Sequence, residues 1–150
     1  MGRIMSFDYG SKRTGIAISD PLKIIASPYK TCKSGYLIDF IKDFIENNTV
    51  DEFVVGFPLN LKSKPTDATR IVKKFVHLLK KTFPLIPIKL VDERYTSKIA
   101  SKAILDAGKN KKYRKEKSNI DKISASLILQ SYLANGKIWY IQYICMVIQY

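Results

Sequence analysis

The chain has 150 residues, the length of one ordinary domain, and its 46% hydrophobic and 26% charged residues exclude a disordered or fibrous protein. Lysine and arginine total 26 against 13 acidic residues, which gives a formal net charge of +13. This excess favours a polyanionic partner, most simply nucleic acid, because each neutralised phosphate releases counterions. The alternative is a lysine-rich surface that only aids solubility.

Hydrophobic periodicity predicts three extended segments, then a helix, a strand, a helix, a strand and two helices. In chain order they fall at residues 4–8, 16–18, 24–31, 36–45, 53–57, 66–83, 86–91, 96–108 and 119–135. Sequential hairpins followed by strand-helix-strand crossovers predict an α/β fold with a mixed five-stranded sheet flanked by helices. Residues 1–136 are expected to form one domain.

Two stretches stand apart from this order. Residues 109–117 are a basic run between helices, which predicts a phosphate-contacting loop or a solvated loop without a role; its candidate contacts are Lys111, Lys112, Arg114 and Lys115. Residues 137–150 are an apolar extension, shorter than the ~20 residues of a membrane helix. The extension could be an extra strand, an oligomer contact or a poorly ordered tail.

The cysteines and the N-terminal residues indicate the cellular compartment of the protein. The chain has 2 cysteines, Cys32 and Cys145, which show neither a disulfide framework nor metal-ligand spacing. The first apolar run is short and is interrupted by Ser6 and Asp8, unlike a signal peptide. We therefore expect a cytoplasmic protein without a membrane partner.

The first two extended segments are joined by a glycine-bounded turn that follows Asp8. A lone acid at the end of a buried strand requires a metal ion, an arginine or a capped turn. The turn also carries Lys12 and Arg13, which are candidate phosphate contacts. Taken alone, Asp8 and Gly10 are also typical of an ordinary turn.

Further carboxylates follow other predicted elements. Asp92 and Glu93 end the last strand, and Asp121 lies in the first turn of the last helix. If these ends meet at one edge of the sheet, three carboxylates could hold two divalent cations, with Mg²⁺ or Mn²⁺ favoured by oxygen ligands. Alternation along a strand lets only one of Asp92 and Glu93 face the site, and we favour Glu93. Taken singly, Asp121 also fits an acid that is favoured in a first helical turn by the helix dipole. Glu93 also fits a surface carboxylate that pairs with a nearby cation.

Four ordered motifs within residues 3–134 resemble the YqgF family of bacterial proteins, also called Holliday-junction-resolvase-like proteins or pre-16S rRNA nucleases; the motifs lie at 7–20, 54–60, 91–97 and 120–130. The resemblance implies a ribonuclease H-like fold, metal-dependent phosphodiester cleavage and a cytoplasmic role in maturing the 5′ end of 16S rRNA. Its catalytic and metal-binding acids fall on Asp8, Glu93 and Asp121. Gly10, Gly15, Gly56 and Pro58 are motif residues with a structural role.

The chain departs in one place from the usual ribonuclease H-like arrangement, as is typical of the family, and in two places from the family pattern itself. The fourth strand ends without the carboxylate that ribonuclease H-like proteins usually carry there, so the fifth strand must supply the second acid. Ser124 stands where alanine is common, and the loop at 61–65 lacks the usual glycine. Lysine and serine lack the backbone freedom of glycine.

The sequence is compatible with several functions, which require different residues. A nuclease acting on precursor rRNA, alone or on ribosomal particles, requires the three acids, whereas a Holliday junction resolvase would apply the same chemistry to DNA, normally as a dimer. A non-catalytic RNA-binding assembly factor requires only Lys12, Arg13, Arg94 and the 109–117 run. A nucleotide hydrolase of the actin-like type would need a second domain. Monomer or dimer, endo- or exonuclease, and the metal's identity stay open.

Overall fold

The computed structural model describes residues 1–58, 66–93 and 96–135, except for the side chains at 96–98, 114 and 135. Arg94, the 61–65 loop and the 137–150 extension therefore lie outside the described residues. The predicted order of strands and longer helices is confirmed. The elements are β1 (Arg3–Tyr9), β2 (Arg13–Ser19), β3 (Ala26–Lys33), η1 (Ser34–Tyr36), α1 (Leu37–Asn47), β4 (Val50–Phe57), α2 (Asp67–Thr82), β5 (Ile88–Asp92), α3 (Thr96–Asp106), α4 (Lys111–Lys115) and α5 (Lys117–Asn135).

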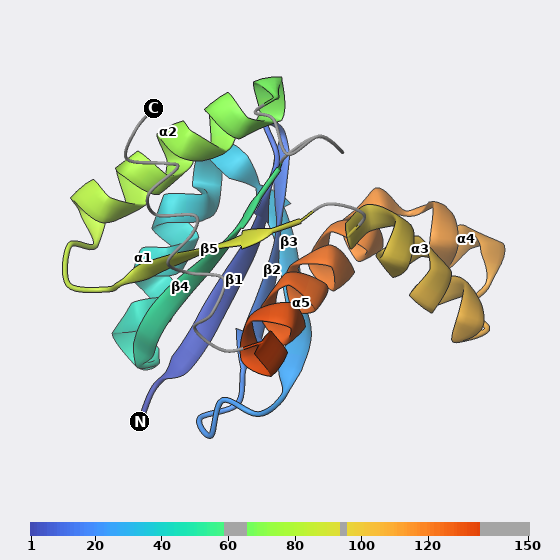
Figure 1. Ribbon diagram of the computed structural model, residues 1–150, viewed down its shortest axis with the longest axis horizontal. Coiled ribbons are helices and arrows are strands. Elements are labelled where there is room, and N and C mark those ends of the chain that lie inside the picture. The colour runs from blue at the N-terminus through green and yellow to red at the C-terminus, as the bar shows by residue number, and fades with distance from the viewer. Residues whose placement is uncertain (59–65, 94–95, 136–150) are drawn as a thin grey trace.

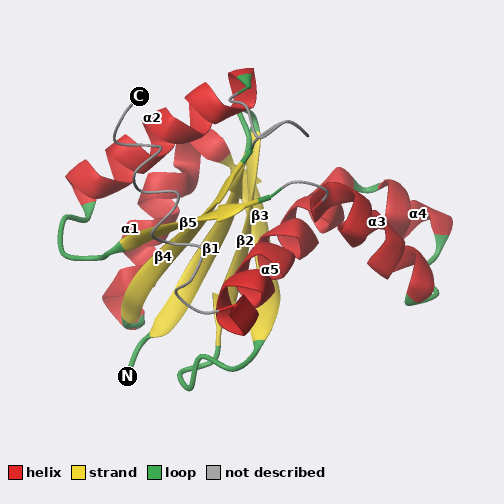
Figure 2. Ribbon diagram, viewed as in Figure 1, coloured by secondary structure: helices red, strands yellow, loops and turns green. Residues whose placement is uncertain are grey.

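The strands form a mixed five-stranded sheet, as predicted, in the order β3-β2-β1-β4-β5 (Figure 2). Strands β1, β2 and β3 pair antiparallel, while β1 pairs parallel with β4 and β4 with β5. The carboxyl ends of the three parallel strands therefore meet at one edge of the sheet, the position at which α/β proteins usually bind ligands. We call it the carboxyl edge.

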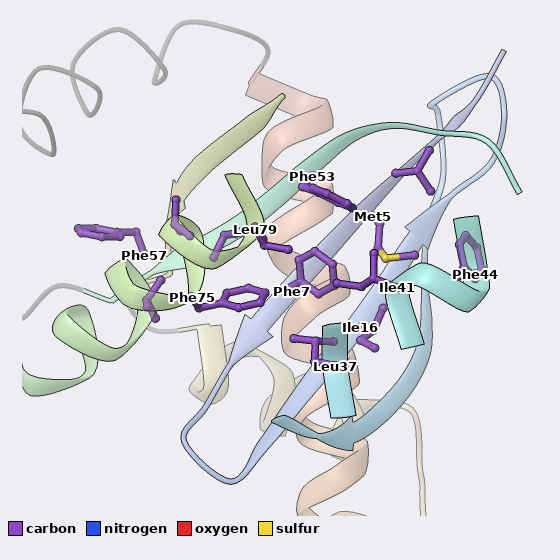
Figure 3. Packing of buried hydrophobic residues seen from close by; sticks show 14 residues of the cluster. Met5, Phe7, Ile16, Leu37, Ile41, Phe44, Phe53, Phe57, Phe75 and Leu79 are labelled. Carbon is purple, nitrogen blue, oxygen red and sulfur yellow. The ribbon is translucent and has the colours of Figure 1, made fainter. Parts of the chain in front are cut away.

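Helices α1 and α2 cover one face of the sheet, and α5 covers the other (Figure 1). The face under α1 and α2 carries the larger core, in which Met5 and Phe7 of β1 are fully buried among aromatic and aliphatic side chains (Figure 3). The ring centroids of Phe7 and Phe53 are 5.6 Å apart, and Phe75 of α2 meets Phe7 edge-on at 5.6 Å. Such aromatic contacts fix the position of β1 within the sheet.

The α5 face has a smaller core, to which alternate residues of each strand contribute. Ile4 of β1, Val54 of β4 and Val91 of β5 pack there with Ala125, Ile128 and Leu129 of α5. Because strand side chains alternate between the two faces, the residues two or four positions further along face α5 as well. These residues include Asp8, Gly56 and Glu93, all at the carboxyl edge.

The basic run at 109–117 differs from the predicted loop. Residues Lys111–Lys115 form the short helix α4, and the Asn110 side chain caps it by accepting the Tyr113 N–H at 2.9 Å. Asparagine is a favoured N-cap, so the helix start was encoded just before the lysines. Helices α3 and α4 contact α5 and extend beyond the sheet (Figure 1).

No helix within the described part of the chain combines the length and the apolar character that crossing a membrane requires.

Candidate active site

Asp8 lies where β1, β2 and the first turns of α5 meet. It pairs with Gly15 of β2 in the antiparallel register. A Cβ atom added to Gly15 would overlap the Asp121 carbonyl and would lie 2.8 Å from the Lys122 backbone nitrogen. The backbone of α5 therefore rests directly on β2, which only glycine permits, and this contact brings Asp121 close to Asp8.

Glu93 follows β5, and its N–H donates to the Phe57 carbonyl of β4 at 3.3 Å. Its carboxylate lies over Gly56: a Cβ atom added there would be 2.5 Å from Glu93 Oε2 and 2.5 Å from Ile128 Cδ1. Gly56 thus leaves the space that the carboxylate fills beneath α5. Asp92, the preceding residue, belongs to the α1 and α2 face by alternation.

The carboxyl groups of Asp8 and Glu93 are hydrogen-bonded to each other. Burial raises the pKa of Glu93, and the charge of Asp8 raises it further. Burial also raises the pKa of Asp8, the hydrogen bond from Glu93 opposes this rise, and the charge of Asp121 adds to it. Two buried like charges are unfavourable, so Glu93 keeps a proton and donates it to Asp8.

Asp121 is held by a different partner. Its carboxylate forms an ion pair with the guanidinium of Arg13, with the Arg13 Nε atom as donor. Arg13 begins β2 on the same face of the sheet as Gly15. The structure therefore brings Asp8 and Glu93 together as a pair and places Asp121 beside them with its own counter-ion.

A cavity of about 310 Å³ opens at the carboxyl edge. Its lining combines two acids with three cations: Asp8, Gly10, Ser11, Lys12, Arg13, Lys117 and Asp121. This mixture suits a metal-assisted phosphate site, because the acids attract cations and the lysines attract phosphate oxygens. Lys12 and Arg13, which the sequence predicted as phosphate contacts, both line this cavity. Lys117 also lines it; it lies within the predicted basic run but was not named as a candidate phosphate contact.

Ser34, at the start of η1, fixes the turn that carries Lys12 and Arg13, and sequence reasoning missed it. Its N–H donates to the Lys12 carbonyl at 3.0 Å, and its hydroxyl donates to the Gly10 carbonyl at 2.5 Å. The Thr14 and Ser34 hydroxyls are 2.9 Å apart, so the fully buried Thr14 donates to Ser34. The hydrogen bond from Ser34 to Gly10 joins positions 24 residues apart in the chain, so no local sequence pattern indicates it.

The other predicted basic residues lie elsewhere. Lys111, Lys112 and Lys115 are exposed on α4 and do not line the cavity. The Arg114 side chain and Arg94 lie outside the described part of the structure. Of the predicted structural residues, Gly10 donates its N–H to the Arg13 carbonyl at 3.1 Å, and the Pro58 carbonyl accepts a bond from the Thr69 hydroxyl of α2.

The donor set of this edge suits a hard divalent cation, because all three acids offer only oxygen atoms. One observation supports the fit: Asp8 and Glu93 are partly buried side by side, their pKa values are raised, and a cation would replace the proton that they share. In the described residues, no group of three or more histidine, cysteine or acidic side chains is arranged as a metal site. The arrangement instead carries a proton on Glu93 and an arginine on Asp121.

The sheet order, with acids at the ends of β1 and β5 and in the first turns of α5, is that of a ribonuclease H-like protein. A family model described as "RuvX: Holliday junction resolvase" matches residues 2–135. The chain belongs to this family, which is also called YqgF. Its members are nucleases, so the chain is a hydrolase of phosphodiester bonds with a nucleic acid as substrate.

Similar proteins match along nearly their whole length. A protein of Amoebophilus asiaticus is 44% identical over 141 residues, which cover 94% of this chain and 100% of that protein. A protein of Porphyromonas gingivalis is 44% identical, with coverage of 90% and 98%, and one of Parabacteroides distasonis is 45% identical, with coverage of 91% and 98%. All three are named "Putative pre-16S rRNA nuclease".

Proposed function

We propose that this protein is a metal-dependent nuclease that matures the 5′ end of precursor 16S rRNA, with Asp8, Glu93 and Asp121 as its catalytic acids. The observation that carries the proposal is the hydrogen-bonded, partly buried carboxyl pair of Asp8 and Glu93, of which Asp8 lines a cavity together with Asp121 and two lysines. Ribosome maturation is a cytoplasmic process in bacteria, in agreement with the expected location. All three proposed catalytic acids lie within residues 1–136, the predicted nuclease domain.

The basic residues bind and orient the nucleic-acid backbone. Lys12 and Lys117 line the cavity and neutralise the phosphate next to the bond that is cut. The exposed lysines of α4 lie beyond the cavity and contact more distant phosphates of the same strand. Since these contacts read charge rather than base sequence, selection of one position in a precursor depends on the shape of the RNA or its particle.

The acids would hold one or two Mg²⁺ or Mn²⁺ ions, and bound ions would activate water and stabilise the departing oxygen. Asp8 is central to this role because it contacts Glu93 and lies within electrostatic range of Asp121. Glu93 must release its proton before both carboxylates can bind a cation, because a protonated carboxyl is a poor metal ligand. The packing of Glu93 over Gly56 keeps this carboxyl in place meanwhile.

RNA is favoured over DNA by the names of the relatives, which are 44% and 45% identical to this chain. The description of the family model favours a DNA four-way junction. A junction resolvase must cut two strands in concert and normally acts as a symmetric dimer. A measurement of both the substrate and the oligomeric state therefore distinguishes an rRNA nuclease from a DNA junction resolvase.

The test compares wild-type protein with Asp8→Asn on labelled precursor 16S rRNA and on a DNA four-way junction, each with Mg²⁺, Mn²⁺ or EDTA. Asp20→Asn is the matched control, because Asp20 directly follows β2 of the first hairpin but lies at the opposite edge of the sheet. We expect metal-dependent RNA cleavage that Asp8→Asn lowers by at least about 10³-fold, with RNA binding within roughly threefold of wild type. Asp20→Asn should cleave normally.

Other outcomes assign other functions. Cleavage of the junction alone by a dimeric species would make the protein a DNA resolvase. Binding without products under any metal would make it a non-catalytic assembly factor. Retained cleavage in Asp8→Asn would overturn the catalytic assignment of the carboxyl pair.

A further inference from the structure

Arg13 is the one cation of the cavity that is engaged with an acid of the site in the described residues. Its guanidinium donates to Asp121, while Lys12 and Lys117 line the same cavity outside the two described ion pairs. The Arg13 side chain is 40% exposed and that of Asp121 is 20% exposed. The pair thus borders solvent, where an arginine can exchange one anion for another.

All three acids of the site are already compensated. Asp8 accepts the proton of Glu93, and Asp121 has the charge of Arg13. A divalent cation that takes an oxygen of Asp121 must compete with the guanidinium for it. Once the cation binds, Arg13 and the metal are like charges side by side, and the guanidinium is repelled from its former partner.

A nearby anion is available in the substrate. A phosphodiester oxygen bound in the cavity lies among Lys12, Arg13 and Lys117, and guanidinium forms strong paired hydrogen bonds with phosphate. The backbone at Arg13 is pinned, because its carbonyl accepts the Gly10 N–H at 3.1 Å and Ser34 holds the adjacent Lys12. The exchange therefore needs only a side-chain rotation.

We propose that Arg13 is a displaceable counter-ion. It neutralises Asp121 while no metal is bound, and it transfers to a substrate phosphate when a divalent cation occupies Asp121. This proposal rests on the nuclease function. It makes metal binding and nucleic-acid binding mutually favourable, because each partner relieves a cost of binding the other. Arg13 is thus the counter-ion of Asp121 before a metal binds and a substrate contact afterwards.

The first test titrates Mn²⁺ into nucleic-acid-free wild-type, Arg13→Gln and Lys12→Gln proteins by calorimetry. Lys12→Gln is the matched control, because it removes an equal charge from the same cavity but no partner of Asp121. We expect Arg13→Gln to bind Mn²⁺ on the order of three- to tenfold more tightly than wild type, by removal of a competitor. Lys12→Gln should change the Kd by less than about twofold, since its contribution is only long-range.

The second test measures binding of a cleavage-resistant RNA oligonucleotide with and without Mn²⁺. Arg13→Gln and Lys12→Gln should both weaken binding and lower the salt dependence by about one phosphate contact. Mn²⁺ should strengthen RNA binding more for wild type than for Arg13→Gln, while Lys12→Gln should keep the wild-type gain. Far-UV circular dichroism of each variant verifies that it is folded.

Two results would overturn the proposal while the nuclease function stands: equal Mn²⁺ affinity of Arg13→Gln and wild type, or equal gains of RNA affinity from Mn²⁺ in those two proteins. Weaker Mn²⁺ binding by Arg13→Gln would also overturn it, by showing that the arginine supports the metal site. A wild-type protein that binds no Mn²⁺ would overturn the metal dependence itself, and the proposal with it.

Discussion

The two edges of the sheet treat their carboxylates in opposite ways. At the carboxyl edge, burial raises the pKa values of Asp8 and Glu93, and the two groups share one proton. At the other edge, the loop between β2 and β3 lies near the N-terminus (Figure 1), and Asp20 accepts the backbone N–H groups of Ile24 and Ile25 at 2.8 and 2.7 Å. These bonds lower the pKa of Asp20.

Asp51 repeats the second pattern. Its carboxylate accepts from Lys23 and from the Gly2 N–H, both at 2.9 Å, and these contacts lower its pKa. The acids at this edge are partly exposed, ionised and provided with hydrogen-bond donors, so they stabilise the fold. The acids of the carboxyl edge are held at a cost to stability, which is the pattern expected of a functional site.

The largest expected effect concerns the close approach that builds the carboxyl edge. Gly15→Ala would force a methyl group into the backbone of Asp121, so either α5 or β2 must move. We expect a loss of about 3 kcal/mol in the free energy of unfolding, measured by urea denaturation, and loss of cleavage. Gly35→Ala is the control, because a Cβ atom there meets nothing within 4 Å and should change stability by less than about 0.5 kcal/mol. A fully stable Gly15→Ala protein would contradict the close packing of α5 on β2.

The next effect is the pH dependence of Glu93→Gln. Because the folded-state pKa of Glu93 is raised, folding retains a proton that the unfolded chain releases above about pH 4.3. Wild-type stability therefore declines as the pH rises above that value, whereas glutamine stays neutral. At pH 8 the variant should melt roughly 3 to 6 °C above wild type, and at pH 4 the two melting temperatures should coincide.

Asp20→Asn should change stability with pH in the opposite direction to Glu93→Gln, which makes it a direct test of the difference between the two edges. The pKa of Asp20 is lowered on folding, so its stabilisation is present above the unfolded-state pKa and is lost as the pH falls through the folded-state value. The variant should be less stable than wild type at pH 7 and equal to it at low pH. Equal pH profiles for Glu93→Gln and Asp20→Asn would show that the two edges do not differ as described.

Much of this fold was predictable because its signals are local or periodic. Apolar runs and turn residues predicted the five strands and the longer helices, and strand alternation favoured Glu93 over Asp92. The structure puts Glu93 against Gly56 and Asp8, where the prediction required it. Its catalytic role, by contrast, stays a prediction until activity is measured.

The contacts that were missed are long-range. Arg13 and Asp121 are 108 residues apart, and no local pattern tells that an arginine next to a predicted phosphate turn will pair with a distant acid. Ser34 likewise acts on a turn 24 residues earlier. The helix α4 was missed for another reason. Its run of lysines has no apolar periodicity, so the one local signal for this short helix was the N-cap residue Asn110.

The smallest expected effect tests whether α5, like the carboxyl pair, contains a group that lowers the stability of the folded protein. Ser124, one turn after Asp121, is 1% exposed, and in the described residues its hydroxyl is the one buried side-chain group without a hydrogen-bond partner. Ser126 on the same helix instead donates to the Ile123 carbonyl at 2.7 Å. Ser124→Ala should therefore gain about 1 kcal/mol, because an unsatisfied polar group disappears and alanine favours helix, whereas Ser126→Ala should lose about 0.5 kcal/mol. Urea denaturation of both variants provides the measurement. If Ser124→Ala lost stability, its hydroxyl would have a partner in the folded protein, and the destabilising groups of this edge would be limited to the like-charged carboxyl pair.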